Sequence, residues 1–186
     1  MISTGDLRRG VAIEMDGQLF HVLEFQHLKI GRGSAQVRMR LRNIRTGAII
    51  DRSVQAGEKW PRVQLEHRPV QFLYEETGNY FFMDQETFDQ IVLNKDKLGD
   101  AVNYLKDSME IQIQMYGEEP IGVELPITVE LLITNTDPGI RGDTATGGTK
   151  PAILETGLTV NVPLFVNEGE RIKVDTRTGE YLERVS

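Results

Sequence analysis

The residues best suited to chemistry in this sequence are basic side chains gathered in one short stretch near its start. Residues 25–50 contain no Asp or Glu, although the chain of 186 residues as a whole has a formal net charge of -7. The basic residues of this stretch are Lys29, Arg32, Arg38, Arg40, Arg42 and Arg45. A basic stretch in an acidic protein is typical of a surface that binds polyphosphate, above all nucleic acid.

Arg32 is the most unusual member of this set because it stands between Gly31 and Gly33, with strand-like runs on both sides. Glycine tolerates positive φ and lets the backbone approach a partner closely. We therefore predict a hairpin that offers Arg32 at its tip as the functional residue. The tip loop would comprise Lys29, Gly31, Gly33 and Ser34.

The run after the tip alternates strictly: residues 37, 39 and 41 are apolar, and residues 38, 40 and 42 are arginine. Alternation with period 2 predicts a strand with one buried and one exposed face. We predict that the exposed arginines contact nucleic-acid phosphates; the candidates are Arg38, Arg40, Arg42 and Arg45. The alternative is an ordinary solvated face, but such a face usually mixes charges of both signs.

Nothing else in the sequence forms a recognisable reactive site. His21, His27 and His67 lack the spacing of a zinc helix, there is no cysteine, and nucleotide-binding and hydrolase motifs are absent. We therefore expect no catalytic residue, no metal, no cofactor and no enzymatic activity. His27 near the tip could touch RNA or have a structural role. No apolar run reaches the ~20 residues of a membrane span, and a cytoplasmic location without membrane contact is expected.

Charge is divided unevenly, which suggests separate units. Residues 1–64 hold 11 Lys and Arg against 6 Asp and Glu, whereas residues 65–127 hold 4 against 13 and residues 128–186 hold 6 against 9. Alternating runs and turn signals dominate all three segments, so we predict three small all-β barrel domains with these bounds. Within them, Asp16–Gly17 predicts a two-residue hairpin turn.

Local signals give further expectations. Asn94 should cap a helix over residues 95–105, and residues 137–149 should form a loop. The acidic pair Glu118–Glu119 should be solvated. Most aromatic residues are expected in cores, and these are Phe20, Phe25, Phe72, Phe82, Phe88 and Phe165.

Residues 150–169 carry a long pattern, Lys-Pro-Ala, four residues, Gly, and then Val-Pro before a final Gly. This pattern closely resembles the signature of the bacterial elongation factor P family, and residues 137–144 and 174–181 are also similar to that family. The resemblance implies an SH3-like (KOW-like) domain followed by two OB folds, arranged as an L of tRNA-like shape.

The resemblance also implies a function. Members bind the 70S ribosome between the peptidyl-tRNA and exit sites, contact ribosomal RNA and promote peptide bonds between consecutive prolines. Arg32 matches the residue that approaches the CCA end of peptidyl-tRNA, and a modifying enzyme acts on this position in many members. Small-subunit contacts would be Gly142, Asp143, Thr144, Tyr181 and Arg184. The protein is expected to be a monomer. For the function, two alternatives stay open: a paralogue of the family, or a general RNA-binding OB protein.

Overall fold

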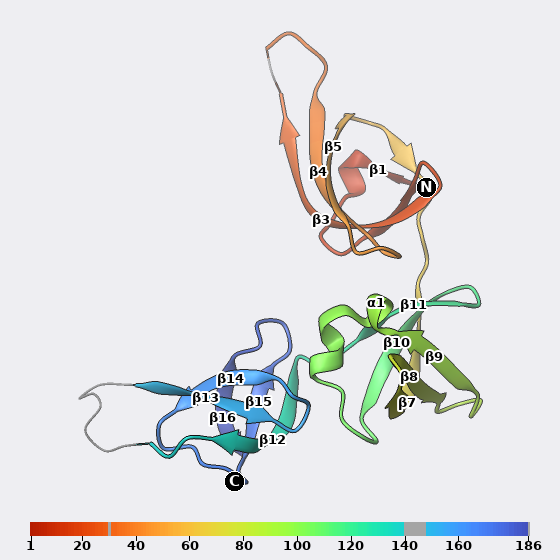
Figure 1. Ribbon diagram of the computed structural model, residues 1–186. Helices are drawn as coiled ribbons and strands as arrows, with labels where there is room; N and C mark the ends of the chain where they lie inside the picture. The colour runs from red at the N-terminus through yellow and green to blue at the C-terminus, as the bar shows by residue number, and fades with distance from the viewer. Residues whose placement is uncertain (30, 140–147, 186) are drawn as a thin grey trace. The chain divides into compact units, whose positions relative to one another are not determined.

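The computed structural model describes residues 1–29, 31–139 and 148–185. The chain forms two compact units: Met1–Arg68 with Ile113–Gly122, and Pro69–Gln112 with Val123–Ser186. Antiparallel strands make up most of the chain, which confirms the all-β prediction (Figure 1). Among the described residues, no helix is long and apolar enough to cross a membrane.

The first barrel is built from a four-stranded antiparallel sheet in the order β2-β3-β4-β5 and a short pair, β1-β6. The strands are β1 Ile2–Ser3, β2 Ala12–Met15, β3 Gln18–Leu28, β4 Gln36–Asn43, β5 Ile49–Gln55 and β6 Lys59–Trp60, with a 3-10 turn at Thr4–Asp6. The sheet curls around buried Ile13, Val22, Met39, Leu41 and Trp60. This curl lets one sheet enclose its own core.

The turn between β2 and β3 has the predicted chemistry. Asp16 has φ 52° and Gly17 has φ 72°, and Met15 pairs directly with Gln18. Positive φ at both central residues matches the right-handed twist of the flanking strands, and Asp and Gly tolerate it best. The prediction of a two-residue hairpin is confirmed.

The central segment forms a five-stranded sheet in the order β11-β10-β7-β8-β9. Its strands are β7 Glu66–Glu76, β8 Asn79–Asp84, β9 Gln90–Asn94, β10 Glu110–Tyr116 and β11 Glu119–Glu124. Asn94 caps the helix as predicted, because its side chain accepts a hydrogen bond from Lys97 N at 3.0 Å. The predicted helix length is wrong: α1 (Lys95–Leu98) ends at Gly99, whose φ of 55° breaks it, and a 3-10 turn follows.

The last segment forms a five-stranded sheet in the order β14-β13-β12-β15-β16. Its strands are β12 Thr128–Thr136, β13 Thr149–Leu154, β14 Thr159–Pro163, β15 Arg171–Asp175 and β16 Tyr181–Val185. β13 was not predicted from the sequence, and it contains Pro151, a residue that is disfavoured inside a sheet. The ladder with β12 ends at the pair Thr136–Ala152, so the missing N–H of Pro151 lies beyond it.

Two of the predicted core aromatics are wrong. Phe20, Phe72 and Phe82 are buried, and Phe25 is half-buried against the first core. Phe88 is 72% exposed and Phe165 is 60% exposed. Both lie in turns between strands, where period-2 alternation no longer decides which side chain faces the core.

Candidate nucleic-acid interface

The predicted basic hairpin is formed by β3 and β4. Their last pair is Leu28 with Gln36, and β5 continues beside β4 as far as the pair Gln36–Gln55. One more hydrogen bond, from Ala56 N to Ala35 O at 2.8 Å, extends this support. A three-stranded base therefore carries the tip, which projects beyond the strands in Figure 1.

The tip loop is open to solvent. Lys29, Arg32, Gly33 and Ser34 are all exposed. Gly31 has φ 59°, a conformation that an L side chain adopts only with strain. An added Cβ there would meet nothing within 4 Å, so backbone conformation rather than space makes glycine suitable.

The arginines of β4 form an exposed row. Arg38, Arg40 and Arg42 face solvent, while Val37, Met39 and Leu41 between them are fully buried. This confirms the predicted alternation. Packing of the three buried side chains determines which face of β4 points into the core. The three arginines must therefore lie on the opposite, exposed face.

The neighbouring strands bring carboxylates to this row. In the strand register, Arg40 lies opposite Glu24 on β3 and opposite Asp51 on β5. Asp51 also forms an ion pair with Arg38, with 3.7 Å between Asp51 Oδ2 and Arg38 Nη2. Glu24 and Asp51 are the residues that bound the acid-free stretch in the sequence. The expectation that the face carries charge of one sign is therefore wrong, because folding places both ends of the stretch beside its middle.

A hollow of about 470 Å³ lies on this face. Its lining residues are Arg9, Glu24, Phe25, Gln26, Arg38, Arg40 and Asp51. Guanidinium groups can donate to phosphate oxygens, and carboxylates can accept from ribose 2′-hydroxyls, so mixed polar groups suit an RNA backbone. Sequence reasoning missed Arg9, because it precedes β2 and joins the site only through the fold.

One histidine beside the site, His21, adds no charge to it at neutral pH. His21 pairs with Arg42 across β3 and β4. Burial, and secondarily the Arg42 charge, lowers the pKa of His21 below its usual value. His27 is exposed and packs edge-on against Phe25, with 5.9 Å between ring centroids, so it has a structural contact.

Arg45 makes a closer ion pair than Arg38 does, with two hydrogen bonds to one carboxylate. Its Nε lies 3.1 Å from Oε1 of Glu119, and its Nη2 lies 3.0 Å from Oε2. Both residues belong to the first compact unit. Glu118 is exposed in the turn, as expected, whereas Glu119 is the first residue of β11 and is bound to Arg45, so the expectation of a turn residue is wrong for Glu119.

The candidate small-subunit contacts lie in the last segment, and Gly142, Asp143 and Thr144 are outside the described residues. Tyr181 is half-buried. Arg184 Nη1 lies 3.2 Å from Glu170 Oε1, and the guanidinium stands over the exposed ring of Phe165 at 5.6 Å from the centroid. Within the described ranges, no three or more His, Asp or Glu could hold a metal ion.

The architecture has known counterparts. A structure titled eukaryotic translation initiation factor 5A from Methanococcus jannaschii matches with a TM-score of 0.54 at 18% identity, and covers 66% of this chain and 90% of that one. An initiation factor 5A family protein from Naegleria fowleri matches with a TM-score of 0.50 at 12% identity, covering 67% and 94%. The fold thus places the chain in a class of multi-domain β-barrel proteins.

Sequence comparison narrows this class. The elongation factor P KOW-like domain matches residues 3–60, the elongation factor P OB domain residues 65–123, and the elongation factor P C-terminal domain residues 129–184. A protein named elongation factor P from Moorella thermoacetica is 55% identical over 184 residues, 99% of this chain and 100% of its own length. One from Pelotomaculum thermopropionicum is 54% identical over 185 residues, with both chains fully covered. The chain belongs to the elongation factor P family, which is a family of translation factors.

Proposed function

We propose that this protein binds the 70S ribosome between the peptidyl-tRNA and exit sites, and that it promotes peptide-bond formation at consecutive prolines. The observation that carries this proposal is Arg32, an exposed arginine on a glycine-shaped tip with a three-stranded base. Such a tip is suited to reach into a narrow RNA site. Family membership supplies the ribosome as the partner.

The chemistry needs no acid or base from the protein. Proline is a poor nucleophile with a fixed φ, so its reaction suffers when the peptidyl-tRNA end is poorly placed. Ideal positioning can lower a barrier by up to ~7–11 kcal/mol, and a fraction of that would suffice. Arg32 would hold the CCA end, and the protein would act without being an enzyme.

The arginine row would position the tRNA or rRNA backbone. Arg38, Arg40 and Arg42 would contact phosphates, and Arg9 would join them at the hollow. Phosphate contacts fix register and orientation. The prediction that Arg45 contacts phosphate stays a prediction, and its guanidinium would first have to leave Glu119.

The remaining assignments follow the same family expectation. We propose three domains at residues 1–64, 65–127 and 128–186, a monomeric state, a cytoplasmic location and a tip that is open to a modifying enzyme. Small-subunit contacts would come from the last domain; the candidates are Gly142, Asp143, Thr144, Tyr181 and Arg184. The acidity of residues 65–186 would limit nonspecific binding to RNA.

Ribosome profiling of a strain that lacks the protein tests the proposal. Pauses should appear at runs of consecutive prolines and disappear when the gene is restored. The purified protein should also speed triproline synthesis in a reconstituted translation system. Pauses spread evenly over all codons, with no effect on triproline synthesis, would contradict the proposed function.

A general RNA-binding role is the second candidate, and the exposed aromatics give it some support. Tyr74 stacks on Phe81 at 4.6 Å between centroids, and Phe165 lies under Arg184. Exposed stacking rings are typical of single-strand binding. Filter binding at physiological salt separates the two candidates: equal affinity for 70S ribosomes and for free RNA of matched length would favour the general role.

A further inference from the structure

The turn between β4 and β5 supports Arg45 through hydrogen bonds to Asn43. The Oδ1 atom of Asn43 accepts hydrogen bonds from Arg45 N at 2.9 Å and from Thr46 N at 3.0 Å. Asn43 Nδ2 in turn donates to Gln18 Oε1 at 3.2 Å, and Gly47 N donates to Asn43 O at 2.8 Å. The backbone of Arg45 is therefore held before its side chain binds anything.

The side chain of Arg45 reaches a hairpin 74 residues away in the sequence. Glu119 opens β11, directly after the turn at Gly117 and Glu118, and both of its carboxylate oxygens accept from Arg45. Two parallel N–H···O bonds define the direction of the pair as well as its distance. The hydrogen bond and charge of Glu119 raise the pKa of Arg45 further above its usual value.

An apolar contact lies beside this ion pair. Ile44, which precedes Arg45, packs against a small buried cluster on the first barrel. Tyr116, the last residue of β10, packs against the same cluster. The buried residues of the cluster are Ala12, Leu19 and Val63. The hairpin is thus attached by a polar contact next to an apolar one, as in the core and rim of an interface.

We propose that Ile44, Arg45, Tyr116 and Glu119 form a clasp that holds the tip-bearing barrel on the β10–β11 hairpin. In this proposal Arg45 positions the barrel, and this role replaces the phosphate contact that the sequence suggested for it. The clasp lies inside one compact unit, yet it joins residues matched by the KOW-like domain to residues matched by the OB domain.

A clasp at this place has a clear use. Residues 61–64 join the two matched segments and are themselves held on the first barrel by the hydrogen bonds Glu14 N to Pro61 O and Val63 N to Ala12 O. The clasp therefore restricts the orientations that remain open to the chain beyond Val63. Every orientation that must be given up on binding costs entropy, so a barrel already fixed on the hairpin binds with less loss. In this respect the inference rests on the proposed function, whereas the existence of the clasp does not.

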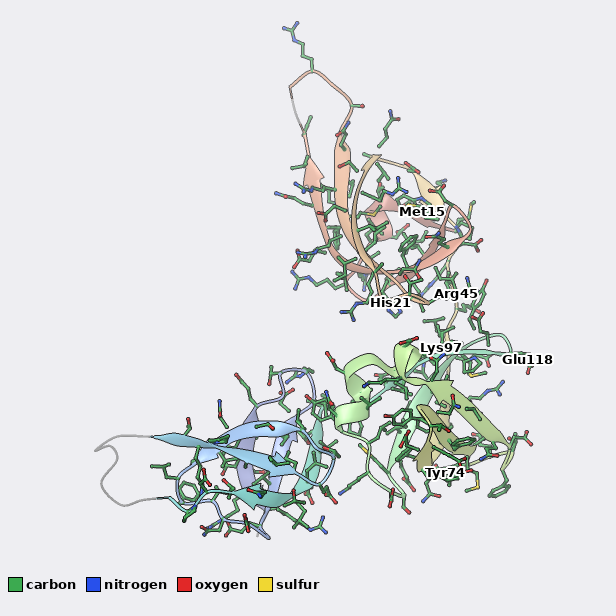
Figure 2. The ribbon with its side chains drawn as sticks, viewed as in Figure 1. Met15, His21, Arg45, Tyr74, Lys97 and Glu118 are labelled. Carbon is green, nitrogen blue, oxygen red and sulfur yellow. The ribbon has the colours of Figure 1, made fainter. Side chains whose placement is uncertain are left out.

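Four variants test the clasp: Arg45→Glu, Glu119→Arg, the double charge swap, and Glu118→Arg as a matched control. Glu118 is exposed, adjacent to Glu119 and carries the same charge, so the control makes the same charge change one residue away (Figure 2). The first measurement is amide hydrogen exchange over residues 113–122 in the free protein. The second is the rate of triproline synthesis.

Each single clasp variant should speed exchange over residues 113–122 by about two- to fivefold, as an exposed ion pair allows. The charge swap should restore slow exchange and most of the synthesis rate, and Glu118→Arg should change neither. Unchanged exchange in both single variants would overturn the clasp. Restored exchange without restored synthesis would show that Arg45 acts on RNA and would overturn its positioning role.

The two readouts also separate this inference from the proposed function. If wild-type protein fails to speed triproline synthesis, the proposed function fails. The exchange measurement still decides whether the clasp exists, because it uses no ribosome.

Discussion

Asp51 on β5 reaches diagonally to Arg38 on β4, with 3.7 Å between Asp51 Oδ2 and Arg38 Nη2, although the residue directly opposite Asp51 is Arg40. More than half of each side chain is exposed. Exposed pairs of this kind contribute little, typically 0.2–1 kcal/mol. Asp51 therefore lowers the net positive charge of the arginine row, but it binds Arg38 too weakly to prevent Arg38 from contacting a phosphate.

Replacing Asp51 with Asn should strengthen ribosome binding. The change removes a carboxylate from the hollow, so affinity for 70S ribosomes at low salt should rise by about two- to fivefold. The slope of log affinity against log salt concentration should steepen by up to about one, the value for one additional phosphate contact. The reason is that Arg38, without Asp51, is free to neutralise a phosphate and release a counterion. Titration of labelled protein with ribosomes at several salt concentrations measures both.

Asp16→Asn is the matched control for this change. It removes a carboxylate that lies 3.7 Å from Arg52 on the same barrel but does not line the hollow. Affinity and salt slope should stay near the wild-type values. Equal gains from Asp16→Asn and Asp51→Asn would mean that only net charge matters and that the arginine row has no special part.

Replacing Arg32 with Ala should separate stability from function. The side chain is exposed at the tip, so the free energy of unfolding should change by no more than about 0.5 kcal/mol. Most ribosome affinity should remain, whereas triproline synthesis should fall sharply. Arg32→Lys should restore only part of the rate, because lysine keeps the charge but loses the planar five-donor fork.

Two further observations bear on Arg32. Intact-protein mass from the native host would reveal a modification, and in that case Arg32→Lys should not restore activity at all. Wild-type synthesis by Arg32→Ala, together with complete loss in Arg40→Glu, would move the functional element from the tip to the strand face.

Asp175 should make stability depend on acid pH. Arg177 donates two hydrogen bonds to the Asp175 carboxylate: Nη2 lies 2.8 Å from Oδ2, and the backbone N lies 2.8 Å from Oδ1. These bonds lower the pKa of Asp175 from 3.8 to about 2. Since folding lowers this pKa, the stabilisation is complete above pH 3.8 and is lost as the pH falls through about 2. The stability difference between wild type and Asp175→Asn should therefore shrink from pH 5 to pH 2.

Urea unfolding at pH 5, 4, 3 and 2 measures this difference. The reading requires that both proteins remain folded without urea at pH 2, which circular dichroism checks. A difference that is constant over the whole range would show that the carboxylate contributes nothing through its charge.

Gly139 should not tolerate a side chain. A Cβ added there would lie 2.3 Å from the carbonyl oxygen of Leu164, and the nearest atoms are backbone. Relief requires a backbone shift, so Gly139→Ala should lower the free energy of unfolding by about 1–3 kcal/mol. In Gly122→Ala the nearest atom would be the Gln114 side chain at 3.7 Å, an ordinary contact, and that control should stay within about 0.5 kcal/mol in urea unfolding.

Much of the local structure could be predicted from the sequence because its causes are local. The alternation of residues 37–42 fixes which side chains of β4 are buried, since successive side chains of a strand point to opposite faces. The turn at Asp16–Gly17 and the cap at Asn94 follow from positive φ and from a side-chain acceptor. The candidate tip residue Arg32 was found in the same way, from two neighbouring glycines.

What only the tertiary structure decided is which residues meet across strands and turns. Glu24, Asp51 and Arg9 join the arginine row through the register of β3, β4 and β5 and through the path of the chain before β2. Arg45 meets Glu119 across 74 residues. Register is set by the packing of whole sheets, and long-range pairs depend on how the hairpin seats on the barrel. A sequence pattern contains spacing along the chain, but it does not contain these distances through space.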